Sequence, residues 1–234
     1  MNRIKVVLLP GMDGTGLLFK PLLDIIPNDI NIEVIPLSQE TDQSVESEVK
    51  RIEKIISDEN IILFAESYSG RIAYELAKRS KISIKHIIFV ASFLSTPSLL
   101  SSLLSKLAQY FPISILRKRI VPQNIINWLC FRSVNSTALI NLLYESINSV
   151  DACILKARLA NISCLLKPQQ ILSIETTYIQ ASHDLFISNH ALTEIQQLFQ
   201  SVDLQKVSGG HFIAQANPQA CLTIITNIIN KNNM

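Results

Sequence analysis

The chain has 234 residues, of which 48% are hydrophobic and 17% are charged, a balance that excludes a largely disordered protein and predicts a sizeable core. Its 21 basic and 19 acidic residues leave a net charge of +2, which gives no strong electrostatic footprint for nucleic acid. No run of about 18 apolar residues lacks a charge or a turn former, so we expect no transmembrane segment.

Short apolar runs alternate with amphipathic helical patterns along most of the chain. Strands are predicted at 4–9, 32–37, 61–65 and 87–91, with helices at 17–26, 43–57 and 69–79. Further strands follow at 177–181 and 202–207, with helices at 189–199 and 218–229. Apolar strands separated by helices are typical of a parallel sheet that is buried on both faces. The sequence therefore predicts an α/β fold with a mostly parallel sheet and helices on both sides.

One long segment interrupts this alternation. Residues 93–175, about 80 in number, contain no convincing strand, and prolines break their helical pattern at Pro97, Pro112, Pro122 and Pro168. A loop of this length without structure of its own is uncommon in a compact domain. We therefore predict a helical cap over one edge of the sheet, formed by residues 93–175 and inserted into a core of residues 1–92 and 176–234.

The cysteines and the N-terminus bear on the compartment. The four cysteines show no CxxC spacing and are too few for a disulfide scaffold. Near the N-terminus, the apolar stretch 6–9 is too short for a secretory signal and stops at Pro10-Gly11. We expect buried, reduced thiols and a cytoplasmic protein.

A candidate nucleophile lies between the third strand and its helix. Ser67 is the central residue of Ala65-Glu66-Ser67-Tyr68-Ser69, which is close to the G-x-S-x-G elbow. In that elbow the serine occupies a sharp, strained turn, and the crowded backbone admits only small residues two positions to either side. Alone the motif is weak, because a serine that merely caps the helix gives the same pattern.

Two further candidates follow the last two predicted strands. Asp184 ends the fifth strand, at the carboxyl edge where ligand sites of open α/β sheets collect. His211 follows two glycines after the sixth strand, in a loop able to direct an imidazole over that edge. A helix-capping aspartate and a surface histidine are the plainer interpretations of each residue alone. Together with Ser67, however, they follow three different strands, and a carboxylate there could orient the imidazole.

The stretch 10–16 after the first strand is rich in glycine. Its order, G-x-x-G-x-G, differs from the G-x-G-x-x-G of dinucleotide sites, and no Gly-Lys-Ser/Thr follows, which disfavours a nucleotide cofactor. Backbone N–H groups of such a loop could instead stabilise an oxyanion.

With these features the chain resembles the α/β-hydrolase family over essentially its whole length. The matching pieces are the turn Pro10-Gly11-Met12, the elbow around Ser67, Asp184 and Gly210-His211. The resemblance implies an α/β-hydrolase fold trimmed to about six strands, because the family's first two strands are missing. Glycine, usual at both flanking positions of the elbow, is replaced by Ala65 and Ser69.

The resemblance also implies a role for each matched residue. Ser67 would be the nucleophile, His211 the base and Asp184 the residue that orients it. The N–H groups of Met12 and Tyr68 would form the oxyanion hole, with Gly11 beside the substrate. No metal or organic cofactor is required.

A serine nucleophile predicts hydrolysis of carboxylic esters or thioesters, with an apolar acyl pocket under the cap. Between residues 93 and 166 there are seven basic residues and two acidic ones. The cluster Arg117, Lys118 and Arg119 could bind an anionic carrier. An acyl carrier protein or coenzyme A has that charge, although ordinary solvated helix faces explain the cluster equally well. The resemblance extends to small carboxylesterases and to pimeloyl carrier-protein methyl esterases of biotin synthesis. A ligand-binding protein on the same fold is the non-enzymatic alternative.

Overall fold

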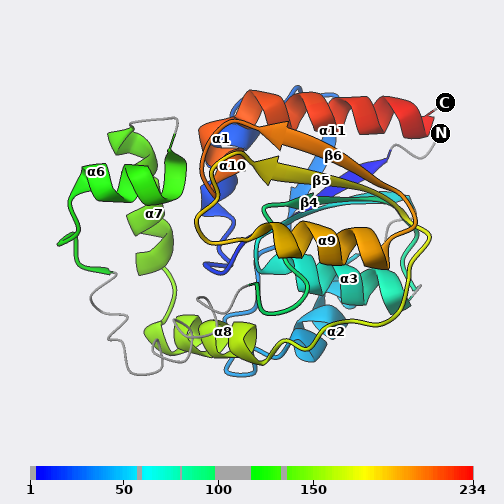
Figure 1. The fold of residues 1–234 in the computed structure, drawn as a ribbon, viewed down its shortest axis with the longest axis horizontal. Coiled ribbons are helices and arrows are strands. Elements are labelled where there is room, and N and C mark those ends of the chain that lie inside the picture. The colour runs from blue at the N-terminus through cyan, green and yellow to red at the C-terminus, as the bar shows by residue number, and fades with distance from the viewer. Residues whose placement is uncertain (1–3, 57–59, 80, 98–116, 133–135, 234) are drawn as a thin grey trace.

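The computed structural model describes residues 4–56, 60–79, 81–97, 117–132 and 136–233. Its strands are β1 (Lys5–Leu9), β2 (Asn31–Val34), β3 (Ile61–Glu66), β4 (Ile84–Val90), β5 (Glu175–Ala181) and β6 (Val202–Val207). They form one sheet in the order β2-β1-β3-β4-β5-β6, and every pair of neighbours is parallel (Figure 1). The predicted six-stranded parallel sheet is confirmed.

The apolar runs become strands because both faces of the sheet are covered. Alternate residues of β1 pack on opposite sides: Val7 and Leu9 belong to one hydrophobic cluster, and Val6 and Leu8 to the other. The central strand β3 is buried at every position. This burial explains why the strands are continuously apolar instead of alternating with polar residues.

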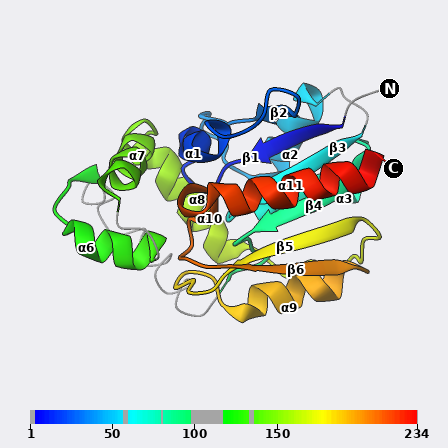
Figure 2. The same cartoon turned by 90° about the horizontal axis from the view of Figure 1, so that it is seen from above.

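The two clusters are closed by helices on opposite faces of the sheet (Figure 2). One face is covered by α2 (Val45–Ile55), α3 (Ser69–Arg79) and α9 (Asn189–Leu198). The other is covered by η1 (Leu17–Phe19), α1 (Lys20–Leu23), α10 (Ile213–Ala216) and α11 (Pro218–Asn233). The helix predicted at 17–26 is shorter in the structure, where it begins as the 3₁₀ turn η1 and ends with α1 at Leu23.

The second strand also ends earlier than predicted. It was expected to continue to residue 37, but β2 stops at Val34. Pro36 has no N–H group to continue the ladder. The next N–H, that of Leu37, donates instead to the Gly14 carbonyl at 2.7 Å. The chain after β2 is thus fastened to the glycine-rich loop that follows β1.

The segment between β4 and β5, residues 91–174, is called the inserted segment below. Its described helices are α6 (Gln123–Ile126), the π-helix η2 (Asn127–Phe131), α7 (Thr137–Asn148) and α8 (Ala152–Cys164). Within the described part, its β-structure is limited to a single bridge from Leu172 to Phe199. Figure 1 shows α6 and α7 beyond the carboxyl ends of the strands. The predicted cap also includes 98–116 and 133–135, which lie outside the described residues.

Among the described helices, none by itself is long and apolar enough to cross a membrane. The helices α7 and α8 meet that criterion only together, and they are bent by 97° relative to each other.

All four cysteines are free thiols, but only two of them are buried. Cys130 and Cys221 lie in the interior, whereas Cys153 and Cys164 are exposed, so the expectation of four buried thiols is wrong. The two exposed thiols belong to α8, whose buried side consists of Ile154, Leu155 and Arg158.

One buried histidine makes the stability of the fold depend on pH. His86 in β4 is buried, and its Nε2 lies 2.9 Å from the hydroxyl of Thr177. Burial, opposed by Glu175 and Asp203 and reinforced by Lys231, lowers the pKa of His86 to about 4. In the unfolded chain the pKa is about 6.5, so the unfolded state takes up the proton first as the pH falls. His86 therefore contributes stability above pH 6.5, and up to about 3 kcal/mol of it should be lost by pH 4.

Urea unfolding of the protein and of His86→Gln at pH 7.5 and pH 5 tests this expectation. The amide nitrogen of glutamine can replace the ring Nε2 but does not titrate in this range. His86→Gln should therefore lose less unfolding free energy between the two pH values. Equal losses of unfolding free energy in both proteins would show that His86 does not cause the loss of stability at acidic pH.

Candidate functional site

The topology brings four loops to one edge of the sheet. All strands run in the same direction, so the loops after β1, β3, β5 and β6 meet at the carboxyl edge. These loops contain the turn Pro10-Gly11-Met12 and the residues Ser67, Asp184 and His211. Ligand sites of open α/β sheets form at this edge.

Ser67 occupies a strained turn between β3 and α3. Its φ angle of 49° lies in the left-handed region, which is uncommon for a residue other than glycine. The Ser67 N–H donates to the carbonyl of Val90 at 2.9 Å, and the Ser67 carbonyl accepts from the Gly70 N–H at 3.1 Å. A Cβ at Gly70 would lie 2.8 Å from the Cβ of Ser92, so only glycine permits this close approach of α3 to the segment that follows β4. Strain of this kind costs about 1–3 kcal/mol and persists only where the surroundings enforce it.

The residue that replaces the second glycine of the elbow has a function of its own. Ser69 is fully buried, and its hydroxyl donates to the carbonyl of Pro10. A Cβ at Gly11 would lie 3.7 Å from the Cβ of Ser67. The elbow is therefore fastened to the turn after β1, beside the candidate nucleophile. The sequence showed only that Ser69 is small.

The three candidate residues form a continuous chain of hydrogen bonds. His211 Nε2 lies 2.9 Å from Ser67 Oγ, and His211 Nδ1 lies 2.8 Å from Asp184 Oδ2. The other carboxylate oxygen, Asp184 Oδ1, accepts from the N–H groups of Phe186 at 2.8 Å and Ile187 at 2.9 Å. Asp184 thus caps the following turn with one oxygen and orients the imidazole with the other. The neighbouring His183 contacts Ser182 instead, at 2.7 Å.

The electrostatics of this chain favour an ionised aspartate beside a basic imidazole. Burial alone would lower the pKa of His211, but the charge and hydrogen bond of Asp184, with a smaller contribution from Glu66, raise it above its usual value. Burial likewise opposes ionisation of Asp184, but the positive charge and hydrogen bond of His211 and the two backbone N–H groups lower the pKa of Asp184. These shifts favour a carboxylate at Asp184 beside an imidazole whose Nε2 lies 2.9 Å from the Ser67 hydroxyl.

A buried carboxyl group next to Ser67 was not recognised from the sequence. Burial, together with the negative charge of Asp13, raises the pKa of Glu66 to about 7, although a hydrogen bond from Gln215 acts in the opposite direction. The Nε2 group of Gln215 lies 3.0 Å from Glu66 Oε1. The available signal was an acidic residue directly at the end of an otherwise apolar strand.

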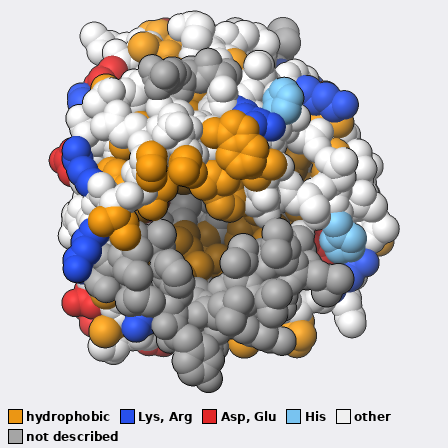
Figure 3. All heavy atoms as spheres, turned by 60° about the vertical axis from the view of Figure 1, so that its left-hand side comes forward, with side chains coloured by type: hydrophobic (Ala, Val, Ile, Leu, Met, Phe, Trp, Pro, Cys, Tyr) orange, Lys and Arg blue, Asp and Glu red, His pale blue; other side chains and the backbone are white. Residues whose placement is uncertain are grey.

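Two aromatic side chains pack against the imidazole of His211. The ring centroids of Phe186 and Phe212 lie 5.3 and 5.4 Å from that of His211. Phe186 is 42% exposed, and in the inserted segment Trp128 is 52% exposed. Figure 3 views the molecule more nearly from the side on which α6 and α7 lie, and hydrophobic side chains gather there around a hollow.

The expected carrier-binding cluster is partly engaged within the inserted segment. Arg117 donates to the carbonyl of Val150. Arg119 donates to Asn141 Oδ1 at 2.8 Å and stacks over the ring of Tyr144 at 5.1 Å. Lys118 is exposed. Two of the three cations therefore stabilise local packing, and their role toward a substrate stays a prediction.

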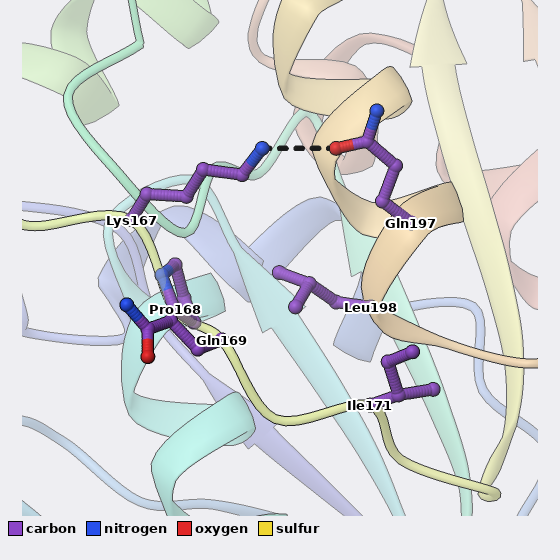
Figure 4. Close-up of a pocket in the computed structure, with 6 residues that line it drawn as sticks. All are labelled: Lys167, Pro168, Gln169, Ile171, Gln197 and Leu198. Carbon is purple, nitrogen blue, oxygen red and sulfur yellow. Dashed lines mark hydrogen bonds between the residues drawn. The ribbon is translucent and has the colours of Figure 1, made fainter.

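None of the three candidate residues lines the following surface pocket. A surface pocket of about 340 Å³ lies between the stretch that precedes β5 and the C-terminal end of α9 (Figure 4). It is lined by Lys167, Pro168, Gln169, Ile171, Gln197 and Leu198, and Lys167 Nζ lies 3.0 Å from Gln197 Oε1 across it. Within the described residues, no group of three or more His, Cys, Asp or Glu side chains is arranged to hold a metal ion.

Solved structures share this architecture, although no family model and no curated protein match the sequence. MenH from S. aureus has a TM-score of 0.79 and 14% identity over 100% of this chain and 96% of that protein. The hydrolase olei00960 from Oleispira antarctica has a TM-score of 0.75 and 14% identity over 98% and 92%. The thioesterase RedJ of the prodiginine pathway in Streptomyces coelicolor has a TM-score of 0.69 and 16% identity, over 96% of this chain and 86% of that protein. The chain therefore has the α/β-hydrolase fold.

The geometry predicts how the imidazole responds to loss of its carboxylate partner. In Asp184→Asn, burial of His211 remains, but the charge that raises its pKa is gone, so the pKa of His211 should fall. The imidazole ¹⁵N and ¹H shifts followed through a pH titration measure this directly. His183→Ala, which leaves Asp184 in place, should not move the His211 titration. An unchanged His211 pKa in Asp184→Asn would contradict the assigned hydrogen bond.

Proposed function

We propose that the protein is a serine hydrolase that cleaves carboxylic esters or thioesters of apolar acyl groups. The chain of hydrogen bonds from Asp184 through His211 to Ser67, at a strained elbow, carries the proposal. The lowered pKa of Asp184 favours the carboxylate that would orient the imidazole, and His211 Nε2 lies 2.9 Å from the hydroxyl whose proton it would accept.

In the first half of the reaction, His211 Nε2 takes the proton of Ser67 while Oγ forms a bond to the carbonyl carbon. The positive charge that develops on the imidazole lies 2.8 Å from Asp184 Oδ2. Collapse of the tetrahedral intermediate breaks the bond to the alcohol or thiol, which leaves with the proton from His211. Water then attacks the acyl-enzyme with His211 as base, and Ser67 recovers its proton as the carboxylic acid departs.

The oxyanion of the tetrahedral intermediate would bind the N–H groups of Met12 and Tyr68. Neither group donates a hydrogen bond to another residue in the described part of the chain. The proximity of Gly11 to Ser67 and the bond from Ser69 to Pro10 bring the Met12 turn beside the elbow. Two backbone donors that converge on one point are the usual means of stabilising such an oxyanion.

The apolar character of the surroundings supports the substrate class. Phe186 contacts the edge of the His211 ring and still exposes 42% of its surface, so it offers an apolar contact next to the reacting carbonyl. The inserted segment, with exposed Trp128, would cover the acyl group as a cap. Thioesters belong in the proposal because RedJ is described as a thioesterase.

The intact chain of hydrogen bonds favours an enzyme over a ligand-binding protein. A neutral ester substrate is also favoured over a carrier-linked one, because Arg117 and Arg119 are engaged with the inserted segment itself.

Removal of the nucleophile tests the proposal most simply. Ser67→Ala should lower kcat for p-nitrophenyl butyrate by at least about 10⁴-fold, because the acyl-enzyme cannot form. Ser208→Ala is a matched control, since Ser208 is an exposed serine in the loop that precedes His211. An Ser67→Ala protein with normal turnover would remove the proposed mechanism.

The acyl pocket predicts a dependence on chain length. Each buried methylene is worth roughly 0.8 kcal/mol, so kcat/KM should rise up to about fourfold per carbon until the pocket is full. Steady-state kinetics with p-nitrophenyl esters from acetate to decanoate measure this dependence. An ester of equal length that ends in a carboxylate serves as the comparison. Faster turnover of the carboxylate-ended ester would contradict an apolar pocket and favour an anionic substrate.

A further inference from the structure

Arg158 of α8 is a fully buried cation whose hydrogen-bond partners among the described residues are all neutral. Its relative exposure is 0%. The Nε group donates to Gln43 Oε1 at 2.8 Å, and Nη2 donates to the carbonyl of Ser38 at 2.7 Å. The remaining terminal nitrogen, Nη1, donates to the carbonyls of Met12 at 2.9 Å and Asp13 at 2.7 Å. The side chain thus connects the inserted segment to the loop that supplies the proposed oxyanion donor.

Burial of this cation imposes an orientation on the loop. Desolvation lowers the pKa of Arg158, but a guanidinium group stays protonated in proteins. The charges of Asp13 and Glu48 favour the cation, but no carboxylate among the described residues accepts a hydrogen bond from it, so its direct partners are dipoles that point toward it. The carbonyls of Met12 and Asp13 supply two of these dipoles, so rotation of either peptide group would remove a direct hydrogen-bond partner of the buried charge.

The peptide groups of this turn are fixed in succession. The carbonyl of Gly11 and the N–H of Met12 belong to the same peptide group, and the Gly11 carbonyl accepts from the Gly14 N–H at 3.0 Å. The Met12 N–H therefore points away from Gly14. Arg158 fixes the next two peptide groups through the carbonyls of Met12 and Asp13.

Gly14 is packed directly against the guanidinium group. Its φ is +71°, and a Cβ there would lie 2.2 Å from Arg158 Nη1. Only glycine therefore allows the guanidinium to lie in this position. The turn and the cation are built as one unit.

A second helix of the inserted segment contacts the same turn. Ser146 of α7 donates to Asp13 Oδ2 at 2.7 Å, and the same oxygen accepts from the N–H and hydroxyl of Thr15 at 3.0 and 2.6 Å. The inserted segment therefore binds the loop after β1 twice: Arg158 binds its backbone carbonyls, and Ser146 binds the carboxylate of Asp13.

We infer that Arg158 is a positioning residue that holds the Met12 N–H in the direction needed to stabilise the oxyanion. The inference rests on the proposed function, since it assigns a residue to the same reaction. It makes the inserted segment part of the catalytic geometry as well as a cover for the substrate. Its effect should appear in the transition state, where the oxyanion develops, and much less in binding of the ground-state ester.

The test begins with Arg158→Gln, which keeps part of the side-chain volume and removes the charge. The kcat for p-nitrophenyl butyrate should fall by about 10- to 100-fold while KM changes less than about twofold, because loss of a whole oxyanion donor costs about 10²–10³. Lys156→Gln is the control, because Lys156 is an exposed cation of the same helix, α8. It should leave both constants unchanged.

Chemical rescue separates positioning from a merely structural contribution. In Arg158→Ala, guanidinium chloride at low millimolar concentration should restore kcat by occupying the vacated site. Equal concentrations of sodium chloride should have no effect. If Arg158→Gln and Arg158→Ala fail to fold, as judged by thermal unfolding, Arg158→Lys keeps the charge. One ammonium group cannot reproduce the guanidinium fork, so Arg158→Lys should fold and still show the loss in kcat.

The outcomes distinguish this inference from the proposed function. Normal kcat in folded Arg158→Gln, or a loss confined to KM, would overturn the role of Arg158 and leave Ser67 catalysis intact. Hydrolysis that persists in Ser67→Ala, or no hydrolysis by the unsubstituted protein, would overturn the proposed function and this inference with it.

Discussion

The left-handed backbone of Ser67 is the constraint on which the arrangement of the site depends. An L-amino acid avoids this conformation unless its surroundings enforce it, and here they do so from three sides. The Val90 carbonyl accepts from the Ser67 N–H, Gly70 allows α3 to approach the segment after β4 closely, and Ser69 donates to Pro10. The buried parallel sheet supplies the rigidity that maintains the strain, because β3 has no exposed position.

Two buried carboxyl groups, those of Asp184 and Glu66, lie near Ser67 and His211, and their surroundings shift their pKa values in opposite directions. Asp184 is stabilised by the imidazole and by two backbone N–H groups, so it remains the ionised partner. Glu66 has weaker compensation, and burial raises its pKa to about 7. Its charge therefore changes across the neutral range, close to His211, whose basicity it increases when ionised. Activity near neutral pH would depend on Glu66 as well as on the imidazole.

Much of the fold and the three central residues of the site could be predicted from the sequence. Buried strands and amphipathic helices are encoded locally by periodicity, and the parallel topology then places Ser67, Asp184 and His211 at one edge. The distances of 2.9 and 2.8 Å between them agree with the expected hydrogen bonds, whereas their catalytic roles are a proposal.

The features that the sequence did not predict depend on contacts between distant residues. Ser69 meets Pro10 across 59 positions, and Arg158 meets Met12 across 146. Arg158 is one of the seven basic residues between 93 and 166, for which a carrier-binding or a solvated surface is expected, but its guanidinium group is buried against the glycine-rich loop. The early end of β2 and the exposure of Cys153 likewise follow from packing that periodicity does not encode.

The central claim is that the strained serine is the nucleophile, and mapping of a covalent adduct tests it most directly. The protein would be treated with a fluorophosphonate, digested with trypsin and fragmented in a mass spectrometer to separate Ser67 from Ser69 within peptide 55–71. We predict one adduct, on Ser67, which forms more slowly as the pH falls because protonated His211 cannot activate the hydroxyl. Absence of an adduct, or modification of a different serine, would contradict the assignment.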